Sequence, residues 1–239
     1  PGQRLHKNTP LEAGYFVRYY LPMTQAFYTE DAEAFAREAM KKLGIGKQSV
    51  VLNLACEEKR VPDALKGIVR SENVYGVDID EDVIAKDPKI VFANVDTDSL
   101  PFKKGMFDVV VSIWGMEHFQ TPKIFHEVER VLKPGGRFIF LTPNLVNPIF
   151  FWAKLLGVSF ADFYYQRILK LPYHPHATYY RFNRAGSVRS VVKSTNGLRI
   201  EELSFLGPAQ ALWYARFSTL LQNVMRVADR LCTVPVLRH

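Results

Sequence analysis

Residues 107–144 constrain the fold more than any other part of the chain, because they predict a strand, a helix and a second strand in close succession. Val109, Val110 and Val111 with Ile113 form an apolar, β-branched run, which is typical of a parallel strand buried on both faces. Thr121 can cap the helix that Pro122 opens, and apolar positions recur with helical spacing until a Lys-Pro-Gly-Gly sequence ends that helix. Residues 137–141 predict the second strand. The unit therefore predicts an α/β fold in which parallel strands are joined by right-handed crossovers.

The size and composition of the chain fit a single α/β domain. It has 239 residues, of which 48% are hydrophobic and 23% charged, enough for one core with a modest appendage. Cys56 and Cys232 give no sign of a disulfide framework, and the amino end has no signal-peptide pattern, so we expect a cytoplasmic protein. The longest apolar stretch, 148–160, contains Lys154 and is too short to span a bilayer. The net charge is +7, but lysine and arginine form no basic run, so no nucleic-acid partner is expected.

Strand and helix signals also alternate outside this unit. Thr29 predicts the start of a helix that ends at Gly44, and residues 79–89 leave room for a turn or two of helix. This alternation predicts a doubly wound parallel sheet whose ligand lies at the carboxyl ends of the strands, where the winding reverses. Further strands are predicted at 49–54, 73–78, 90–94 and 198–205, and further helices at 62–69, 184–195 and 209–231.

Three motifs carry a family resemblance. Phe-Asp-Val-Val-Val-Ser, Glu-His and Arg-Val-Leu-Lys-Pro-Gly-Gly follow one another between residues 107 and 136. In that order they resemble the second half of a class I S-adenosylmethionine (SAM)-dependent methyltransferase. The resemblance implies a Rossmann-like sheet of seven strands in the order 3-2-1-4-5-7-6, with helices on both faces and SAM as the cofactor. Only residues 233–239 follow the last predicted helix, so we expect the seventh strand to be short or absent.

The resemblance also implies that the chain is one methyltransferase-like domain, residues 1–239, with four successive parts. These are an N-terminal helical segment (1–48), a cofactor-binding core (49–144), an aromatic-rich cap insertion (145–183), and a carboxyl-terminal part of the sheet with a final helix (184–239).

The expected cofactor contacts follow the ends of the strands. Asp78 ends the second predicted core strand, where its carboxylate can accept hydrogen bonds from both ribose hydroxyls; the alternative is that it caps the following turn. Asp96 precedes a Leu-Pro-Phe sequence and so resembles the family's acceptor for the adenine amino group. Trp114 either packs over the cofactor or belongs to the core. The full set of expected cofactor-binding residues is Asn53, Ala55, Cys56, Asp78, Ile79, Val95, Asp96, Thr97, Ser112 and Trp114.

The turn after the first core strand departs from the family pattern. Family members there read Asp-Leu-Gly-Cys-Gly-x-Gly, because residues without a Cβ atom let the backbone turn sharply and approach the cofactor. This chain has Asn53 in place of the aspartate, and Ala55, Glu57 and Lys59 in place of the glycines. Glu57 can repel the cofactor's carboxylate, whereas Lys59 or Arg60 can attract it. We therefore expect weak SAM binding, and a cofactor-poor scaffold protein is the alternative function.

A nicotinamide dehydrogenase is a third function class, and it is disfavoured because no Gly-x-Gly-x-x-Gly sequence follows the first core strand.

The acceptor side is expected near two histidines. His118 lies just past the strand at 109–113 and is the preferred general base, with a role in holding the loop as the alternative; His176 is the second choice, and Asn144 could orient the acceptor. His174-x-His176 has no carboxylate or cysteine partner at a zinc-like interval, so no metal site is expected. The aromatic and basic residues of the expected cap allow a sugar, a phenol or a lipid-like head group equally well as the small-molecule acceptor. The aromatic residues of the cap are expected to pack together, dimerise, or touch a membrane surface.

Overall fold

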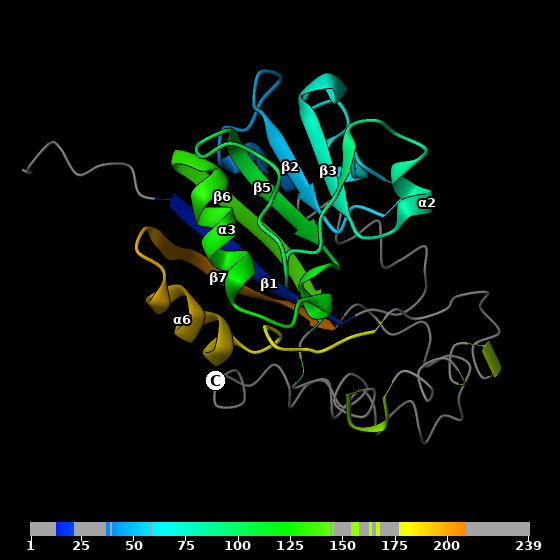
Figure 1. Ribbon diagram of the computed structural model, residues 1–239. Helices are drawn as coiled ribbons and strands as arrows, with labels where there is room; N and C mark the ends of the chain where they lie inside the picture. Colours follow the sequence, from blue (N-terminus) through cyan, green and yellow to red (C-terminus); the bar gives the residue numbers. More distant parts are fainter. Residues whose placement is uncertain are drawn as a thin grey trace, which may run out of the picture.

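The computed structural model describes residues 13–21, 37–38, 40–57, 59–143, 145, 154–157, 163, 166–167 and 177–208. Within these residues a twisted sheet forms the centre of the molecule, and α3 lies across one face of it (Figure 1). The helices are α2 (Glu81–Ile84), α3 (Lys123–Val131) and α6 (Ala185–Ser194), with 3₁₀ turns η1 (Asp63–Leu65), η2 (Ser71–Asn73) and η3 (Met116–His118). Their positions confirm the predicted helix at 184–195 and the short one within 79–89.

The sheet has seven strands in the order β4-β3-β2-β5-β6-β1-β7, and every neighbouring pair is parallel. The strands are β1 (Ala13–Leu21), β2 (Val51–Leu54), β3 (Val74–Asp78), β4 (Ile90–Phe92), β5 (Phe107–Ile113), β6 (Leu132–Pro143) and β7 (Leu198–Pro208). The run from β4 through β6 confirms the predicted 3-2-1-4-5 order, and the direction of winding reverses between β2 and β5.

The place predicted for the last strand is taken by a strand from the other end of the chain. β1 lies between β6 and β7 and is parallel to both (Figure 1). The expectation that residues 1–48 are helical is therefore wrong for Ala13–Leu21, a segment of Tyr, Phe and Val residues that favours a strand. Residues 37–38 and 40–42 are helical, and this helix ends at Gly44, as predicted. The predicted strand at 233–239 lies outside the described residues.

Apolar residues alternate between two cores, one on each face of the sheet. Val110 packs against α3 and α6, together with Phe138 and Phe140 of β6. The intervening residues of the same strands, including Val109 and Ile139, pack on the opposite face. Because both faces are covered, the strands read as continuous apolar runs, which confirms the doubly wound interpretation. The apolar positions predicted along α3 are all buried: Ile124, Phe125, Val128, Val131 and the adjoining Leu132.

Two details of the strand–helix–strand unit differ from the prediction. Thr121 does not cap α3; Pro122 is the residue before the helix, without a side-chain cap, because the Thr121 hydroxyl donates to Asp96 at 3.0 Å instead. The Lys-Pro-Gly-Gly sequence lies inside β6 rather than before it. There the pairing with β5 shifts: Leu132 faces Phe107 and Arg137 faces Val109, so the intervening residues form a bulge.

In the part of the chain that the structure describes, no helix combines the length and apolarity needed to cross a membrane.

Candidate cofactor and acceptor site

The candidate site lies along the carboxyl ends of β2, β3, β4 and β5. The segments that leave these strands begin at Ala55, Ile79, Ala93 and Trp114, respectively. In a doubly wound sheet, ligands bind at this edge, next to the point where the strand order reverses. The predicted cofactor-binding residues, all of which the structure describes, thus lie in or directly after these strands.

The first turn has a left-handed backbone even though it has lost its glycines. Ala55 has φ 52° and Glu57 has φ 46°, two of only four non-glycine residues with positive φ in the described part of the chain. The other two are Trp114 (φ 62°) and Tyr180 (φ 50°). A residue with a Cβ pays roughly 1–2 kcal/mol for this conformation, and such strain tends to persist at functional sites. The main-chain shape that glycine favours is therefore retained here at an energetic cost.

The Asn53 side chain links the two ends of the first turn by hydrogen bonds. Its buried side-chain amide donates to the carbonyl oxygens of Lys59 (3.1 Å) and Arg60 (3.4 Å). A carboxylate at this position could not donate to either carbonyl. The replacement of the family's aspartate therefore leaves the turn organised, now by an amide that matches two carbonyl acceptors.

The flanking basic residues do not both face the candidate site. Arg60 is largely buried, pairs with Asp87 at 2.5 Å and donates to the carbonyl of Ser71 at 2.8 Å. It therefore braces the loops that follow it in the chain, and its guanidinium is engaged within the protein rather than at the first turn. Lys59 is exposed and pairs with Asp63 at 3.1 Å.

The Cys56 side chain points away from the turn into the protein. A Cβ on Gly76 would lie 2.8 Å from the Cys56 sulfur, so the thiol fills the space that this glycine leaves on β3. Burial, followed by the nearby Asp78 carboxylate, raises the pKa of the Cys56 thiol to about 12. Cys56 is thus a neutral packing residue, and a cofactor contact from it would involve its main chain.

Asp78 joins the first turn to the second. One carboxylate oxygen accepts from the backbone N–H of Glu57 at 2.8 Å, and the other accepts from Ile79 (2.8 Å) and Asp80 (3.1 Å). The capping alternative is therefore confirmed as a contact, while the ribose contact stays a prediction. The Ile79 side chain is 64% exposed at this edge.

Asp96 holds the loop after β4 against the start of α3. It accepts hydrogen bonds from the backbone N–H groups of Gln120 (3.0 Å) and Thr121 (2.8 Å), and from the Thr121 hydroxyl. Its neighbours differ in exposure: Val95 is in the core, whereas Thr97 is exposed and donates from its hydroxyl to the carbonyl of Asn94. The adenine contact of Asp96 stays a prediction.

The Leu-Pro-Phe segment is clamped to α3 by an ion pair that the sequence analysis missed. Glu127 accepts from the backbone N–H of Leu100 at 2.7 Å. Arg130, 2.7 Å from Glu127, donates to the carbonyl oxygens of Leu100 and Phe102, both at 2.7 Å. Their i, i+3 spacing was the available signal, but only the folded chain brings residues 100–102 to them.

The turn after β5 packs directly on the first turn. A Cβ on Gly115 would lie 2.7 Å from the Ala55 Cβ and 2.6 Å from the Ser112 hydroxyl. Ser112 is fully buried and donates to the carbonyl of Leu54 at 3.2 Å. Trp114 packs against the core on the face of the sheet opposite α3 and α6. Val109 and Leu141 belong to that core, which fits the core alternative.

The Glu-His pair joins this turn to residues 177–180. The Glu117 carbonyl accepts from the N–H groups of Tyr179 (2.8 Å) and Tyr180 (3.1 Å). His118 Nδ1 lies 2.8 Å from the carbonyl oxygen of Ala177; since a carbonyl only accepts, Nδ1 carries the proton. The alternative that His118 holds the loop is therefore what the structure shows. His174, His176 and Asn144 lie outside the described residues.

A buried polar chain runs behind this pair. Asn183 donates from its side chain to the Thr142 hydroxyl at 2.6 Å, and that hydroxyl donates to Glu117 Oε2 at 3.1 Å. All three residues are buried. Glu117 belongs to the Glu-His motif, but its burial and its hydrogen-bond partners depend on segments 25 and more residues away, which no local pattern reveals.

Comparison with known proteins supports the resemblance for the core of the chain. Residues 52–140 match the model of the methyltransferase domain. Over 135 residues the chain is 30% identical to a demethylmenaquinone methyltransferase of Symbiobacterium thermophilum, covering 51% of this chain and 53% of that protein. It is 32% identical over 102 residues to a probable S-adenosylmethionine-dependent methyltransferase of Mycolicibacterium smegmatis, covering 41% of this chain and 39% of the relative. Residues 52–140 are thus similar to SAM-dependent methyltransferases.

A solved S-adenosylmethionine dependent methyltransferase from Mesorhizobium loti is also similar, with 25% identity, coverage of 48% of this chain and 55% of that chain, and a TM-score of 0.39. The chain spans about half the length of the first curated relative, 53%. The methyltransferase family uses SAM as its cofactor, and the segment that matches includes the first turn, Asp78 and Asp96.

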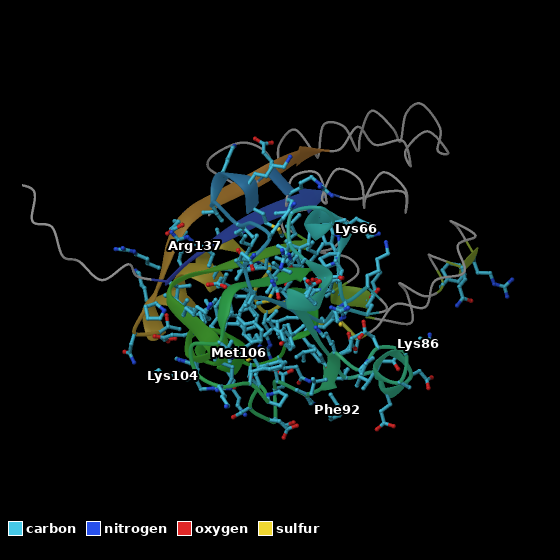
Figure 2. All side chains as sticks on the ribbon, turned by 90° about the horizontal axis from the view of Figure 1, so that it is seen from above. Lys66, Lys86, Phe92, Lys104, Met106 and Arg137 are labelled. Carbon is cyan, nitrogen blue, oxygen red and sulfur yellow. The ribbon has the colours of Figure 1, made fainter. Side chains whose placement is uncertain are left out.

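A separate cavity of about 270 Å³ lies at the opposite edge of this methyltransferase domain. It is lined by the amino ends of β2, β5 and β6, including Ser49, Asp108 and Lys133. Lys133 pairs with Asp108 at 2.8 Å, and Arg137, beside β7 (Figure 2), pairs with Glu201 at 3.0 Å. These charges are matched within the protein, and the cavity is remote from the carboxyl-end site.

Proposed function

We propose that this chain transfers the methyl group of SAM to a small-molecule acceptor by in-line displacement. The observation that carries the proposal is the left-handed backbone at Ala55 and Glu57. A chain that had abandoned the cofactor would have no reason to keep two strained residues where its relatives have glycine. The proposal extends to the residues around this turn, since Asp78 and Asp96 lie at the ends of the next two strands along the sheet.

SAM supplies an electrophilic methyl group on a sulfonium, so the protein contributes chiefly by alignment. In this proposal Asp78 binds the ribose and Asp96 the adenine amino group. His118 supports acceptor deprotonation: its Nδ1 is held by Ala177, so the second ring nitrogen of the neutral imidazole is the basic one. The carbonyl of Ala177 thereby selects the tautomer that a base needs.

The acceptor we favour is glycan-like or lipid-like, with an anionic group. Lys154 in the cap insertion has a lowered pKa, through burial and then through the nearby Arg184 and Arg181, so three basic groups lie near one another. The same insertion exposes Leu155 (63%) and Phe163 (54%). Basic and apolar groups side by side suit an amphiphilic anion. A peripheral membrane contact or a homodimer would cover the same exposed apolar side chains.

A weakly active or inactive scaffold protein is the second candidate, and one observation favours it. The carboxylates of Asp78 and Asp96 already accept three or more hydrogen bonds each from protein groups. A cofactor must share these oxygens or displace the protein donors, which lowers its affinity.

Calorimetric titration with SAM and with NAD separates these functions. We expect SAM binding with a dissociation constant above the low micromolar range and no NAD binding. Asp78→Ala should abolish the SAM signal, and Asp96→Asn should weaken binding roughly tenfold, which corresponds to about 1.4 kcal/mol. Asp98→Asn is the matched control, because Asp98 is exposed and two residues away. Absence of any SAM signal at millimolar cofactor would leave the scaffold function.

A further inference from the structure

Glu117 lies between the cofactor side and the acceptor side of the site. It follows Gly115, whose missing side chain lets the turn after β5 contact Ala55 and the carbonyl of Leu54 in the first turn. Its own carbonyl binds Tyr179 and Tyr180 at the end of the cap insertion. In the proposed function, the methyl group passes between these two sides.

The carboxyl group of Glu117 is only partly satisfied by the protein. The residue is 5% exposed. Oε2 accepts from the Thr142 hydroxyl, whose oxygen in turn accepts from Asn183. The backbone N–H of Glu117 itself also acts on the carboxyl group, and the described residues supply no other donor to Oε1. Buried carboxyl groups normally have partners for both oxygens, so a ligand group is a natural complement to the remaining one.

The electrostatic surroundings of Glu117 disfavour its charged form. The pKa of the Glu117 carboxyl is raised to about 8. Burial is the main cause, and the neighbouring Glu57 carboxylate acts in the same direction. Hydrogen bonds from the Glu117 backbone N–H and from Thr142 oppose this, but the described residues supply no cation that acts on the group. Glu117 is therefore mostly neutral at pH 7, and an adjacent positive charge would favour its ionisation.

We propose that Glu117 faces the sulfonium of SAM and loses its proton when that cation binds, so that the site distinguishes the charged methyl donor from its neutral demethylated product. The inference rests on the proposed function. The proton passes from the Glu117 carboxyl to solvent as SAM binds. When the methyl group moves to the acceptor, the sulfonium charge disappears, the acceptor O–H or N–H loses its proton, and Glu117 takes up one proton. The demethylated product then faces a neutral group and is held less tightly than SAM.

Proton release on binding is directly measurable. We would titrate SAM, and separately S-adenosylhomocysteine, into the full chain at pH 7 in phosphate and in Tris, whose ionisation enthalpies differ. The dependence of the binding enthalpy on the buffer gives the number of protons released. We expect about one proton per SAM and markedly fewer for S-adenosylhomocysteine. The release should fall when the titration is repeated at pH 9, where free Glu117 is already ionised.

Three variants assign the proton to its source. Glu117→Gln keeps an acceptor for Thr142 and should abolish the release on SAM binding. Glu57→Gln, on the exposed first turn, removes a negative charge near Glu117, so more Glu117 is already ionised at pH 7 and fewer protons should be released. This variant replaces Glu117→Gln as the test if the buried substitution prevents folding. Glu129→Gln is the matched control: its carboxylate lies beside Gly197, away from the site, and should release the wild-type number of protons.

The outcomes separate this inference from the proposed function. SAM binding without proton release overturns the role of Glu117 but leaves the proposed function standing. Equal proton release for SAM and S-adenosylhomocysteine, or unchanged release in both Glu117→Gln and Glu57→Gln, also overturns the role of Glu117. Complete absence of SAM binding overturns both.

Discussion

The side-chain amide of Asn53 donates to the main-chain carbonyl of Lys59 at 3.1 Å and so ties the end of β2 to the far side of the first turn. The same nitrogen lies 3.4 Å from the carbonyl of Arg60. This contact explains how the turn keeps its shape without the family's aspartate and glycines. It also means that restoring the family residue at this one position should harm the protein.

Asn53→Asp should destabilise the fold by about 2 kcal/mol, because a buried carboxylate would face two carbonyl oxygens with nothing to donate. Urea denaturation measures the loss. Asn73→Asp is the matched control: Asn73 also donates to a carbonyl, that of Lys47, but at an exposed position. An effect of equal size in both variants would contradict the role assigned to Asn53.

Glycine at Ala55 or Glu57 should relieve backbone strain. Since both residues have positive φ, the relief of roughly 1–2 kcal/mol offsets the entropy that glycine adds to the unfolded chain, and each variant should be as stable as the wild type or more stable. Ala85→Gly, at an exposed residue without positive φ, should instead lose about 0.5–1 kcal/mol.

The triple change of Ala55, Glu57 and Lys59 to glycine should also tighten SAM binding, by about two orders of magnitude if the side chains cost a few kcal/mol. Calorimetry with SAM checks this. If the wild type binds SAM at low micromolar concentration and the triple variant binds no better, the side chains do not obstruct the cofactor.

Gly115→Ala should disrupt the junction between the first turn and the turn after β5. The added Cβ would lie within 2.7 Å of both the Ser112 hydroxyl and the Ala55 Cβ, and overpacking of this kind costs about 1–3 kcal/mol. SAM binding should weaken as well. Gly46→Ala is the control, because nothing lies within 4 Å of the added atom; thermal denaturation of the two variants should differ clearly.

The stability of the protein should depend on pH through Glu117. Its pKa is about 8 in the folded chain, above the usual value of 4.5, so the folded state holds a proton that the unfolded state has released between these limits. The free energy of unfolding therefore falls as pH rises from about 4.5 to about 8. The Glu117→Gln variant has no carboxyl proton at this position. Its free energy of unfolding should therefore rise relative to that of the wild type as pH increases from about 4.5 to about 8, by on the order of a few kcal/mol. Parallel stability curves from pH 5 to pH 8 would contradict it.

Local patterns were sufficient for the central unit of this protein. The β-branched run of β5, the apolar spacing along α3 and the positions of α6 and β7 depend on residues close in sequence, and periodicity reports them. The motifs also predicted that Asp78 and Asp96 lie at the edge of the sheet formed by the carboxyl ends of its strands. The predicted alternatives for Asp78 and His118, capping a turn and holding a loop, were local hydrogen-bonding possibilities that the structure realises.

What the sequence alone determined was thus the α/β class, the order of the five strands from β4 to β6 and the edge where the candidate site lies. Only the tertiary structure decided that β1 pairs between β6 and β7, that Ala55 and Glu57 are held at positive φ, and that Glu117 is buried with Thr142 and Asn183. These features share one physical reason. Strand pairing, burial and backbone strain are fixed by groups far apart in the chain, and their energies exist only once those groups are in contact.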